Sequence, residues 1–239
     1  MAVTVGNSNT ATGDSITSLS ASVTVAADDT CILMLPVGYN ASAGHFPLTG
    51  DSGTDTGVFT VQTTGQNDNY GTDNGQWGGA LTLFDDHANW PGTGSTSFTV
   101  NFNSSVSGAR LLVIALKGTD AVTASVWDDG AASGTAVDVS ITSNSDDMVL
   151  YGLPNFDNLP SFTEDDAGAV EIATVSVGGV DARWHREPGD TTSHNIGGDF
   201  GASVDWGMIA ISMAAAATAG GPRNPLGHAL KGPFGGPIG

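Results

Sequence analysis

The sequence predicts an all-β protein built as a sandwich of two antiparallel sheets. Three observations favour this fold. Short apolar or alternating segments are separated by turn residues, and the 239 residues include 34 glycines. The acidic residues are 22 Asp and only three Glu, and Asp favours turns whereas Glu favours helix surfaces. No segment has the periodicity of a helix longer than about two turns.

Two kinds of pattern define the expected strands. Continuous apolar runs at 31–37 and 109–116 predict strands buried on both faces. Alternation at 97–102 predicts a strand with Phe98, Val100 and Phe102 on one face. Further strands are expected at 15–25, 58–62, 78–84, 121–127, 135–141, 148–153, 169–177 and 203–213. We expect an N-terminal segment 1–13, one sandwich domain 14–213 and an extended arm 214–239.

The end of the chain differs from the rest in both composition and charge. Residues 220–239 contain four prolines and seven glycines, which exclude a helix or a central strand. They carry two basic residues and no acid, in a chain of net charge −19. Apolar residues recur there every fourth position. We expect an arm that docks on a partner subunit through Arg223, Leu226, Leu230, Lys231 and Phe234, the alternative being a disordered end with no role.

Composition also excludes several classes of partner. A strongly negative chain repels phosphates, so we expect no nucleic-acid partner and no anionic membrane. No run approaches the ~18 apolar residues of a membrane span, and the N-terminus lacks the pattern of a secretory signal. The single cysteine, Cys31, begins an apolar run and is expected to be buried and inert.

Candidate ligand sites are weak in the sequence. Paired Asp residues at 28/29, 85/86, 128/129, 146/147 and 165/166 allow a Ca²⁺ site, but turn formation and solvation are the better explanation and no ordered calcium-loop spacing is present. His87, His185 and His194 have no zinc-site spacing. No catalytic motif is found, and we expect neither an enzyme nor a bound cofactor.

The segment 181–187 combines Asp181, Arg183, Trp184, Arg186 and Glu187. One interpretation is a second interface patch in which Trp184 and Arg186 contact a partner. The other is a strand whose arginines pair with neighbouring acids. A carbohydrate-binding module or adhesin would instead use Trp rings as stacking platforms, and the candidates for that role are Trp77, Trp90 and Trp184.

The order of motifs in the central region adds a family resemblance. Gly78-Gly-Ala-Leu-Thr82 is followed by Asn89-Trp-Pro-Gly-Thr-Gly94, an alternating strand and a buried strand. Later glycine pairs lie at 178–179 and 197–198, before a last strand with Trp206. This pattern resembles jelly-roll domains in virion proteins of tailed phages and in some bacterial surface proteins.

The resemblance implies a jelly-roll type of sandwich and a structural role in a virion. We therefore expect a capsid decoration or cement protein that forms a homo-oligomer, with a trimer as one option, and contacts the major capsid protein. It would be made in the host cytoplasm and released by lysis. A tail-fibre component that binds host-surface glycans is the alternative.

Overall fold

A computed structural model describes residues 2–40, 60–66, 76–84, 93–129, 134–156, 161–177, 180–190, 193–204 and 206–216. These segments contain thirteen strands and no helix, and hence no helix long and apolar enough to cross a membrane. The sequence-based candidates that lie outside the described residues are Arg223, Leu226, Leu230, Lys231, Phe234, Asp85, Asp86, His87 and Trp90.

The described strands form three antiparallel sheets. The first has the order β1 (Thr4–Val25), β5 (Gly94–Lys117), β2 (Cys31–Asn40), β4 (Gln76–Phe84) and β3 (Thr60–Gln66). The second has the order β10 (Val170–Val177), β11 (Val180–Pro188), β8 (Met148–Phe156), β13 (Gly207–Ala215) and β6 (Thr119–Asp129). The third has the order β7 (Gly134–Thr142), β12 (Ser193–Val204) and β9 (Phe162–Glu164). The all-β, antiparallel prediction is confirmed, but three sheets replace the two that were expected.

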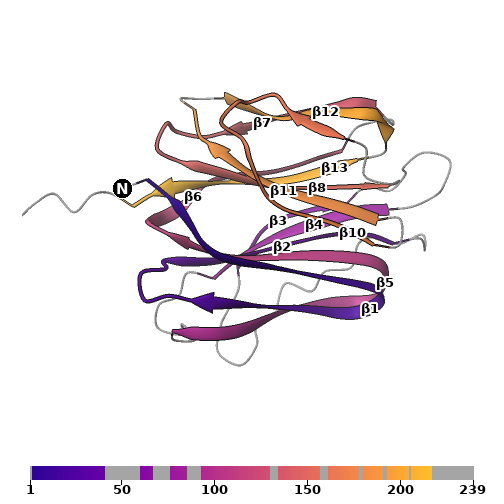
Figure 1. Ribbon diagram of the computed structural model, residues 1–239, viewed down its shortest axis with the longest axis horizontal. Helices are drawn as coiled ribbons and strands as arrows, with labels where there is room; N and C mark the ends of the chain where they lie inside the picture. Colours follow the sequence, from indigo (N-terminus) through magenta and orange to yellow (C-terminus); the bar gives the residue numbers. More distant parts are fainter. Residues whose placement is uncertain are drawn as a thin grey trace, which may run out of the picture.

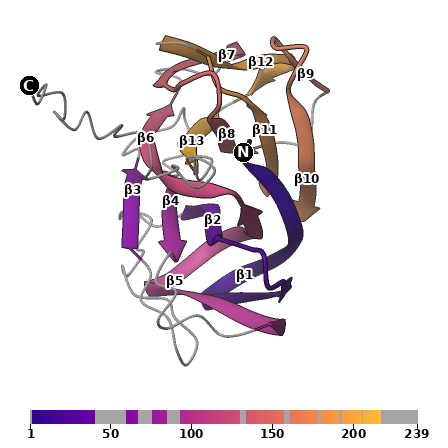
Figure 2. The ribbon, with the colours of Figure 1, turned by 90° about the vertical axis from the view of Figure 1, so that its left-hand side faces the viewer.

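The sheets lie in layers (Figure 1). Apolar side chains form three cores in this stack. A first core joins the facing sides of the first and second sheets. A second core lies on the other side of the first sheet, and a third core lies between the second and third sheets. Figure 2 shows β7 and β12 at one end of this stack and the β1–β5 pair at the other.

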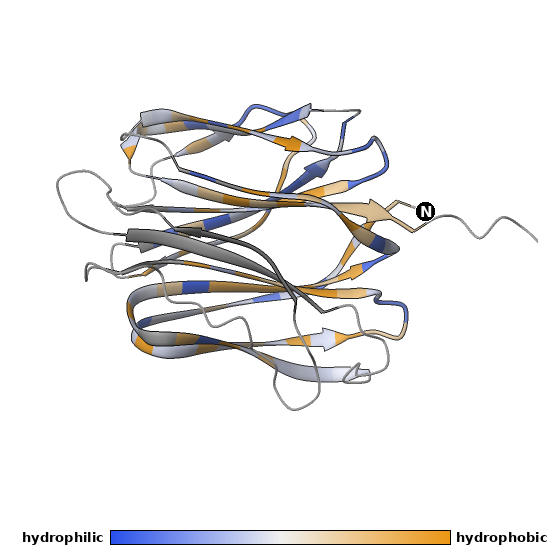
Figure 3. Cartoon of the chain, turned by 180° about the vertical axis from the view of Figure 1, so that it is seen from behind, coloured by the Kyte–Doolittle hydropathy of each residue, from blue (hydrophilic) through white to orange (hydrophobic). Residues whose placement is uncertain are grey.

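The central strands belong to two cores at once. In β2, Leu33 and Leu35 point into the first core, whereas Ile32 and Met34 point into the second, and all four are fully buried. Strand β5 alternates in the same way, and β8 and β13 alternate between the first and third cores. The prediction that 31–37 and 109–116 form strands buried on both faces is confirmed. Figure 3 shows apolar residues concentrated on the strands of the inner layers.

The second core exists because the β1–β5 pair bends over its own sheet. Residues 4–14 of β1 pair with 108–117 of β5, whereas residues 16–25 pair with 94–106. The register shifts between Ile16 and Ser18, and Ser15 has a positive φ of 54°. The strands predicted at 97–102 and 109–116 are therefore one bent strand. The polar stretch 103–108, which ends in Gly108, has the composition of a turn. Strand β1 nevertheless pairs with β5 on both sides of this stretch. Strand β1 also begins at Thr4, inside the segment 1–13 that the sequence analysis set apart.

Strand β12 was not predicted because its glycines suggested turns. In the structure these glycines lie within the strand, where neighbouring strands approach too closely to leave room for a side chain. A Cβ at Gly197, where φ is +140°, would lie 2.0 Å from the Val137 carbonyl oxygen of β7. A Cβ at Gly198 would lie 2.2 Å from the Thr163 carbonyl oxygen of β9. Any side chain at either position would clash with backbone, so glycine allows β12 to pair on both edges.

One buried arginine connects the first two sheets. Arg110 of β5 is fully buried, and its guanidinium donates to Asp14 Oδ1 at 3.0 Å and to the Gly13 and Ala109 carbonyl oxygens. It also donates to the Val177 carbonyl oxygen at the end of β10. The charge is therefore partnered on both sides of the first core, as a buried arginine requires.

The shared central strands predict a strong dependence of stability on their side chains. Leu112 is fully buried in the first core, so Leu112→Ala should lower the free energy of unfolding by about 2–5 kcal/mol. Val170→Ala removes a side chain that is 45% exposed and should cost about 0.5 kcal/mol or less. Urea denaturation of both variants measures the difference, and equal losses would contradict this assignment of the core.

Candidate functional site

A row of ionisable side chains runs along one face of β11. Asp181, Arg183, His185 and Glu187 occupy alternate positions of this strand, so all four point to the side that carries the third sheet. Each residue is at most 9% exposed. Four neighbouring ionisable groups inside a protein need partners, because burying an unpaired charge is costly. We refer to these four residues as the β11 polar row.

Arg183, the second residue of the row, has a partner on each side. Its Nη1 lies 3.8 Å from Glu171 Oε2 of β10, and its guanidinium carbon lies 5.9 Å from the centre of the Phe162 ring. A carboxylate on one side and an aromatic face on the other are both favourable surroundings for a guanidinium. This end of the row therefore contains a compensated positive charge.

His185 lies in the middle of the row, between aromatic rings and an acid. Its ring stacks on Tyr151 of β8 with centroids 5.2 Å apart and planes 13° apart, and Phe162 packs on it at 5.5 Å. Its Nδ1 lies 2.8 Å from Glu164 Oε1 of β9. Burial lowers the pKa of His185, and the Glu164 carboxylate opposes that shift. The Nε2 atom is buried and has no hydrogen-bond partner among the described residues.

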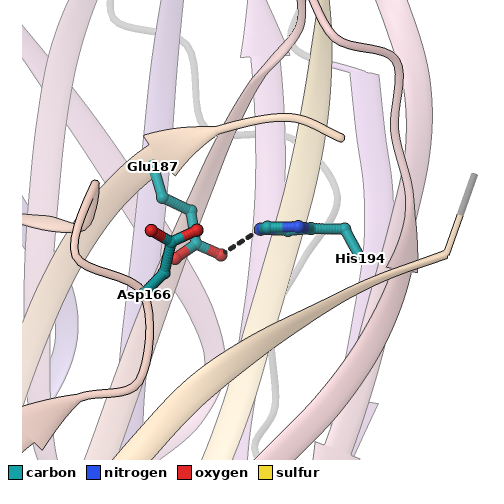
Figure 4. Close-up of side chains that lie close together, drawn as sticks. All are labelled: Asp166, Glu187 and His194. Carbon is teal, nitrogen blue, oxygen red and sulfur yellow. Dashed lines mark hydrogen bonds and ion pairs between the residues drawn. The ribbon is translucent and has the colours of Figure 1, made fainter. Parts of the chain in front are cut away.

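Glu187 lies at the other end of the row and contacts two further ionisable residues. Its Oε1 lies 2.7 Å from Nε2 of His194 on β12, and its Oε2 is buried with no hydrogen-bond partner among the described residues. One ligand atom each from Asp166, Glu187 and His194 lies within 4.8 Å of the other two. Figure 4 shows the His194 ring directed at Glu187, with the Asp166 carboxylate beside it.

The turn after β9 holds Asp166 in this position. The Asp166 carboxylate accepts a hydrogen bond from the Gly168 backbone N–H at 2.6 Å, and its carbonyl oxygen accepts one from the Ala169 N–H at 3.0 Å. The Asp165 N–H donates to the Gly197 carbonyl oxygen of β12 at 3.2 Å. The turn is therefore attached to the same strand that carries His194. We refer to Asp166, Glu187 and His194 as the acid–histidine cluster.

The electrostatics of this cluster are those of a site with excess negative charge. Burial raises the pKa of Glu187 to about 7, against the opposing effect of its contact with His194. Burial, followed by the Glu187 carboxylate, raises the pKa of Tyr151 still further above its usual range, so that the hydroxyl stays protonated. The Tyr151 hydroxyl is also buried and has no hydrogen-bond partner among the described residues. Such an arrangement can hold a proton or a metal cation.

The structure buries one of the two residues of the expected second patch. Trp184 is fully buried in the first core, where its indole N–H donates to the Leu35 carbonyl oxygen at 3.2 Å. A ring with no exposed surface fits neither an interface patch nor a sugar platform. Arg186 is half-buried and lines a cleft of about 220 Å³ together with Asp146, Gly168 and Glu187. Trp77 lies on β4, whose side chains are not described.

Several of the Asp residues considered for Ca²⁺ have hydrogen-bond or ion-pair partners within the protein. Asp28 pairs with Lys117 at 2.8 Å, and Asp29 accepts a hydrogen bond from the Ala26 N–H at 2.7 Å. Asp147 accepts hydrogen bonds from Thr123 and Ser212 at 2.7 and 3.0 Å. These contacts are those of turn and anchoring residues. Of the paired positions, only 165/166 contributes to the acid–histidine cluster.

The cluster was not predicted as a site. His194 had been considered only for zinc spacing along the chain, and Glu187 only as a partner for arginines. One sequence pattern does indicate part of this site. Asp181, Arg183, His185 and Glu187 alternate along the chain, which places four ionisable groups on one face of a strand. The positions of Asp166 and His194 depend on how β9 and β12 pair, which the sequence pattern did not provide.

Comparisons with protein-family models, with curated proteins and with solved structures found no match to this chain. Its function must therefore be argued from its own residues.

The raised pKa of Glu187 predicts a specific dependence of stability on pH. The folded state holds this proton more tightly than the unfolded chain, so its stabilising effect is complete below about pH 4.5 and is lost as pH rises through about 7. Relative to Glu187→Gln, the wild type should lose up to about 3 kcal/mol of unfolding free energy over that range. Urea denaturation in a buffer that contains a chelator measures this difference.

Glu171→Gln is the matched control, because the Glu171 side chain is 47% exposed. Glu171→Gln also removes a partner of Arg183, so the comparison concerns pH dependence: its unfolding free energy should run parallel to that of the wild type across the same pH range. A constant difference between the wild type and Glu187→Gln at every pH would show that Glu187 does not bind its proton more tightly in the folded state.

Proposed function

We propose that this chain is a non-enzymatic structural protein of a tailed-phage virion, most simply a capsid decoration or cement protein. In this proposal the sheets form a jelly-roll type of body, and the residues after 213 form an arm that docks on neighbouring subunits. The partners are further copies of the chain and the major capsid protein. The motifs at 78–82 and 89–94 support the assignment to virion proteins.

The observation that carries a structural role is the construction of the body. Central strands such as β2 and β5 are buried on both faces, so each apolar side chain in them holds two layers together. The β11 polar row lies between the second and third sheets, and each of its four residues is at most 9% exposed. A layered body with enclosed polar groups is more typical of a structural protein than of an enzyme, which needs an open pocket for its substrate.

Charge supports the docking part of the proposal. Residues 220–239 carry +2, and the remaining 219 residues carry −21. An arm of opposite sign is attracted to the acidic body of a neighbouring copy, and its apolar residues add contact area once it is there. No observation favours glycan binding in the same way, because Trp184, one of its three candidate platforms, is buried.

Removal of the arm tests this proposal. The full chain should sediment as an oligomer and should be found in virions purified from a lysate, and a chain that ends at residue 219 should lose at least tenfold in affinity for itself or for those particles. Sedimentation velocity over a range of concentrations and co-sedimentation with particles measure the two effects. Leu226→Ser with Phe234→Ser should reproduce the loss, because both remove apolar anchors.

His228→Ser is the control, since it changes the arm between two proposed anchors without removing either. Unchanged assembly and particle binding after the deletion would contradict the docking arm. A full chain that stays monomeric, is absent from particles and binds an array of glycans would contradict the virion proposal and favour the adhesin.

A further inference from the structure

The acid–histidine cluster has the composition and spacing of a metal site. We propose that Asp166, Glu187 and His194 bind one divalent transition-metal cation, with Zn²⁺ as the best fit. Each residue supplies one ligand atom, and the three atoms lie within 4.8 Å of one another. The ligands come from the turn after β9, from β11 and from β12, so the ion would join the second and third sheets.

An unpartnered buried atom provides an independent reason to expect a ligand here. Glu187 is 2% exposed, yet its Oε2 has no hydrogen-bond partner among the described residues. Buried polar atoms are nearly always satisfied in folded proteins. A cation held by the Glu187 carboxylate would give Oε2 a partner.

The nearby basic residues leave this negative charge uncompensated. Arg183 of the same row is 3.8 Å from Glu171, and Arg186 extends from the opposite face of β11. Arg110 and Lys117 bond to Asp14 and Asp28. His194 is the only basic group that the structure places against Glu187 within the described residues. A divalent cation would neutralise the two facing carboxylates of Asp166 and Glu187, which a single imidazole does only in part.

The donor set decides which cation fits. A neutral imidazole nitrogen with carboxylate oxygens suits Zn²⁺ and its first-row neighbours, whereas Ca²⁺ takes six to eight oxygens and Mg²⁺ keeps much of its water. Two ligands of one tetrahedral Zn²⁺, each bonded at about 2.0–2.2 Å, stand about 3.4 Å apart. The 2.7 Å between His194 Nε2 and Glu187 Oε1 would have to widen by about 0.7 Å, which side-chain rotation can supply.

The cluster lies close to the protein surface on the side of Asp166. Asp166 is half-buried, whereas Glu187 and His194 are buried. Three protein ligands leave at least one position of a four-coordinate ion for water. Binding of an ion at this cluster is independent of the proposed virion function.

Titration calorimetry of the full chain, without an affinity tag and after treatment with a chelator, tests the proposal. The chain should bind one Zn²⁺ with saturation, and neither Ca²⁺ nor Mg²⁺ should bind with comparable affinity. Bound Zn²⁺ should also raise the melting temperature, because it binds the folded state only. Absence of saturable Zn²⁺ binding, or Ca²⁺ binding of equal affinity, would overturn the proposal.

Two variants of neighbouring residues separate coordination from general effects of charge. Asp166→Asn keeps a carbonyl oxygen that can accept the Gly168 N–H, so the turn should survive, but it removes the charged ligand. We expect at least a tenfold loss of Zn²⁺ affinity. Asp165→Asn removes an equal charge from the exposed adjacent residue and should change affinity less than twofold. Equal affinities of the two variants would refute the assignment of Asp166.

X-ray absorption of the zinc-loaded wild type provides a test that requires no variant. The spectrum should indicate one imidazole nitrogen among oxygen ligands, as supplied by His194 with the two carboxylates. Sulfur in the coordination shell would place the ion at Cys31, and two or more imidazoles would place it elsewhere on the chain. Either result would overturn the proposed site.

Discussion

The whole architecture depends on strands that bury both of their faces. A strand such as β2 contributes alternate residues to two different cores, so neither core can form without it. The cost of ordering one backbone segment is then offset by apolar contacts on two sides. The same arrangement recurs in β8 and β13 on the other side of the first core. The layers are consequently coupled, and the third sheet is held against the rest by the inner strands of the second.

This arrangement explains which parts of the fold were readable in the sequence. Continuous apolar runs such as 31–37 directly reflect burial on two faces, and they were predicted correctly. The third sheet was not expected, because β12 is held between its neighbours by glycines that alone suggest turns. The bend in β5 was also missed, since polar residues between two apolar stretches have the composition of a loop. Pairing with β1, a long-range interaction, keeps them in a strand.

The candidate site illustrates the same limit. Local alternation places His185 and Glu187 on one face of β11, and the sequence contains that information. It does not contain the pairing of β9 and β12 with other strands, which brings Asp166 and His194 to Glu187. The site is therefore a product of tertiary structure. Trp184 shows the converse error: it shares a strand with charged residues, but it points to the opposite face and is buried in the first core.

The pairing of β1 with β5 has a consequence for how the chain folds. Thr4 pairs with Lys117, and Val25 pairs with Gly94, so during synthesis β1 is made well before its partner β5. Contacts this distant in sequence slow folding and leave strand edges exposed in the meantime. Residues 4–18 are mostly polar and are exposed or partly exposed. Before β5 is available, such a polar segment has little tendency to aggregate in water. The late synthesis of β5 thus favours polar residues in the first part of β1, and the buried apolar residues of β1 lie in its last part, 19–25.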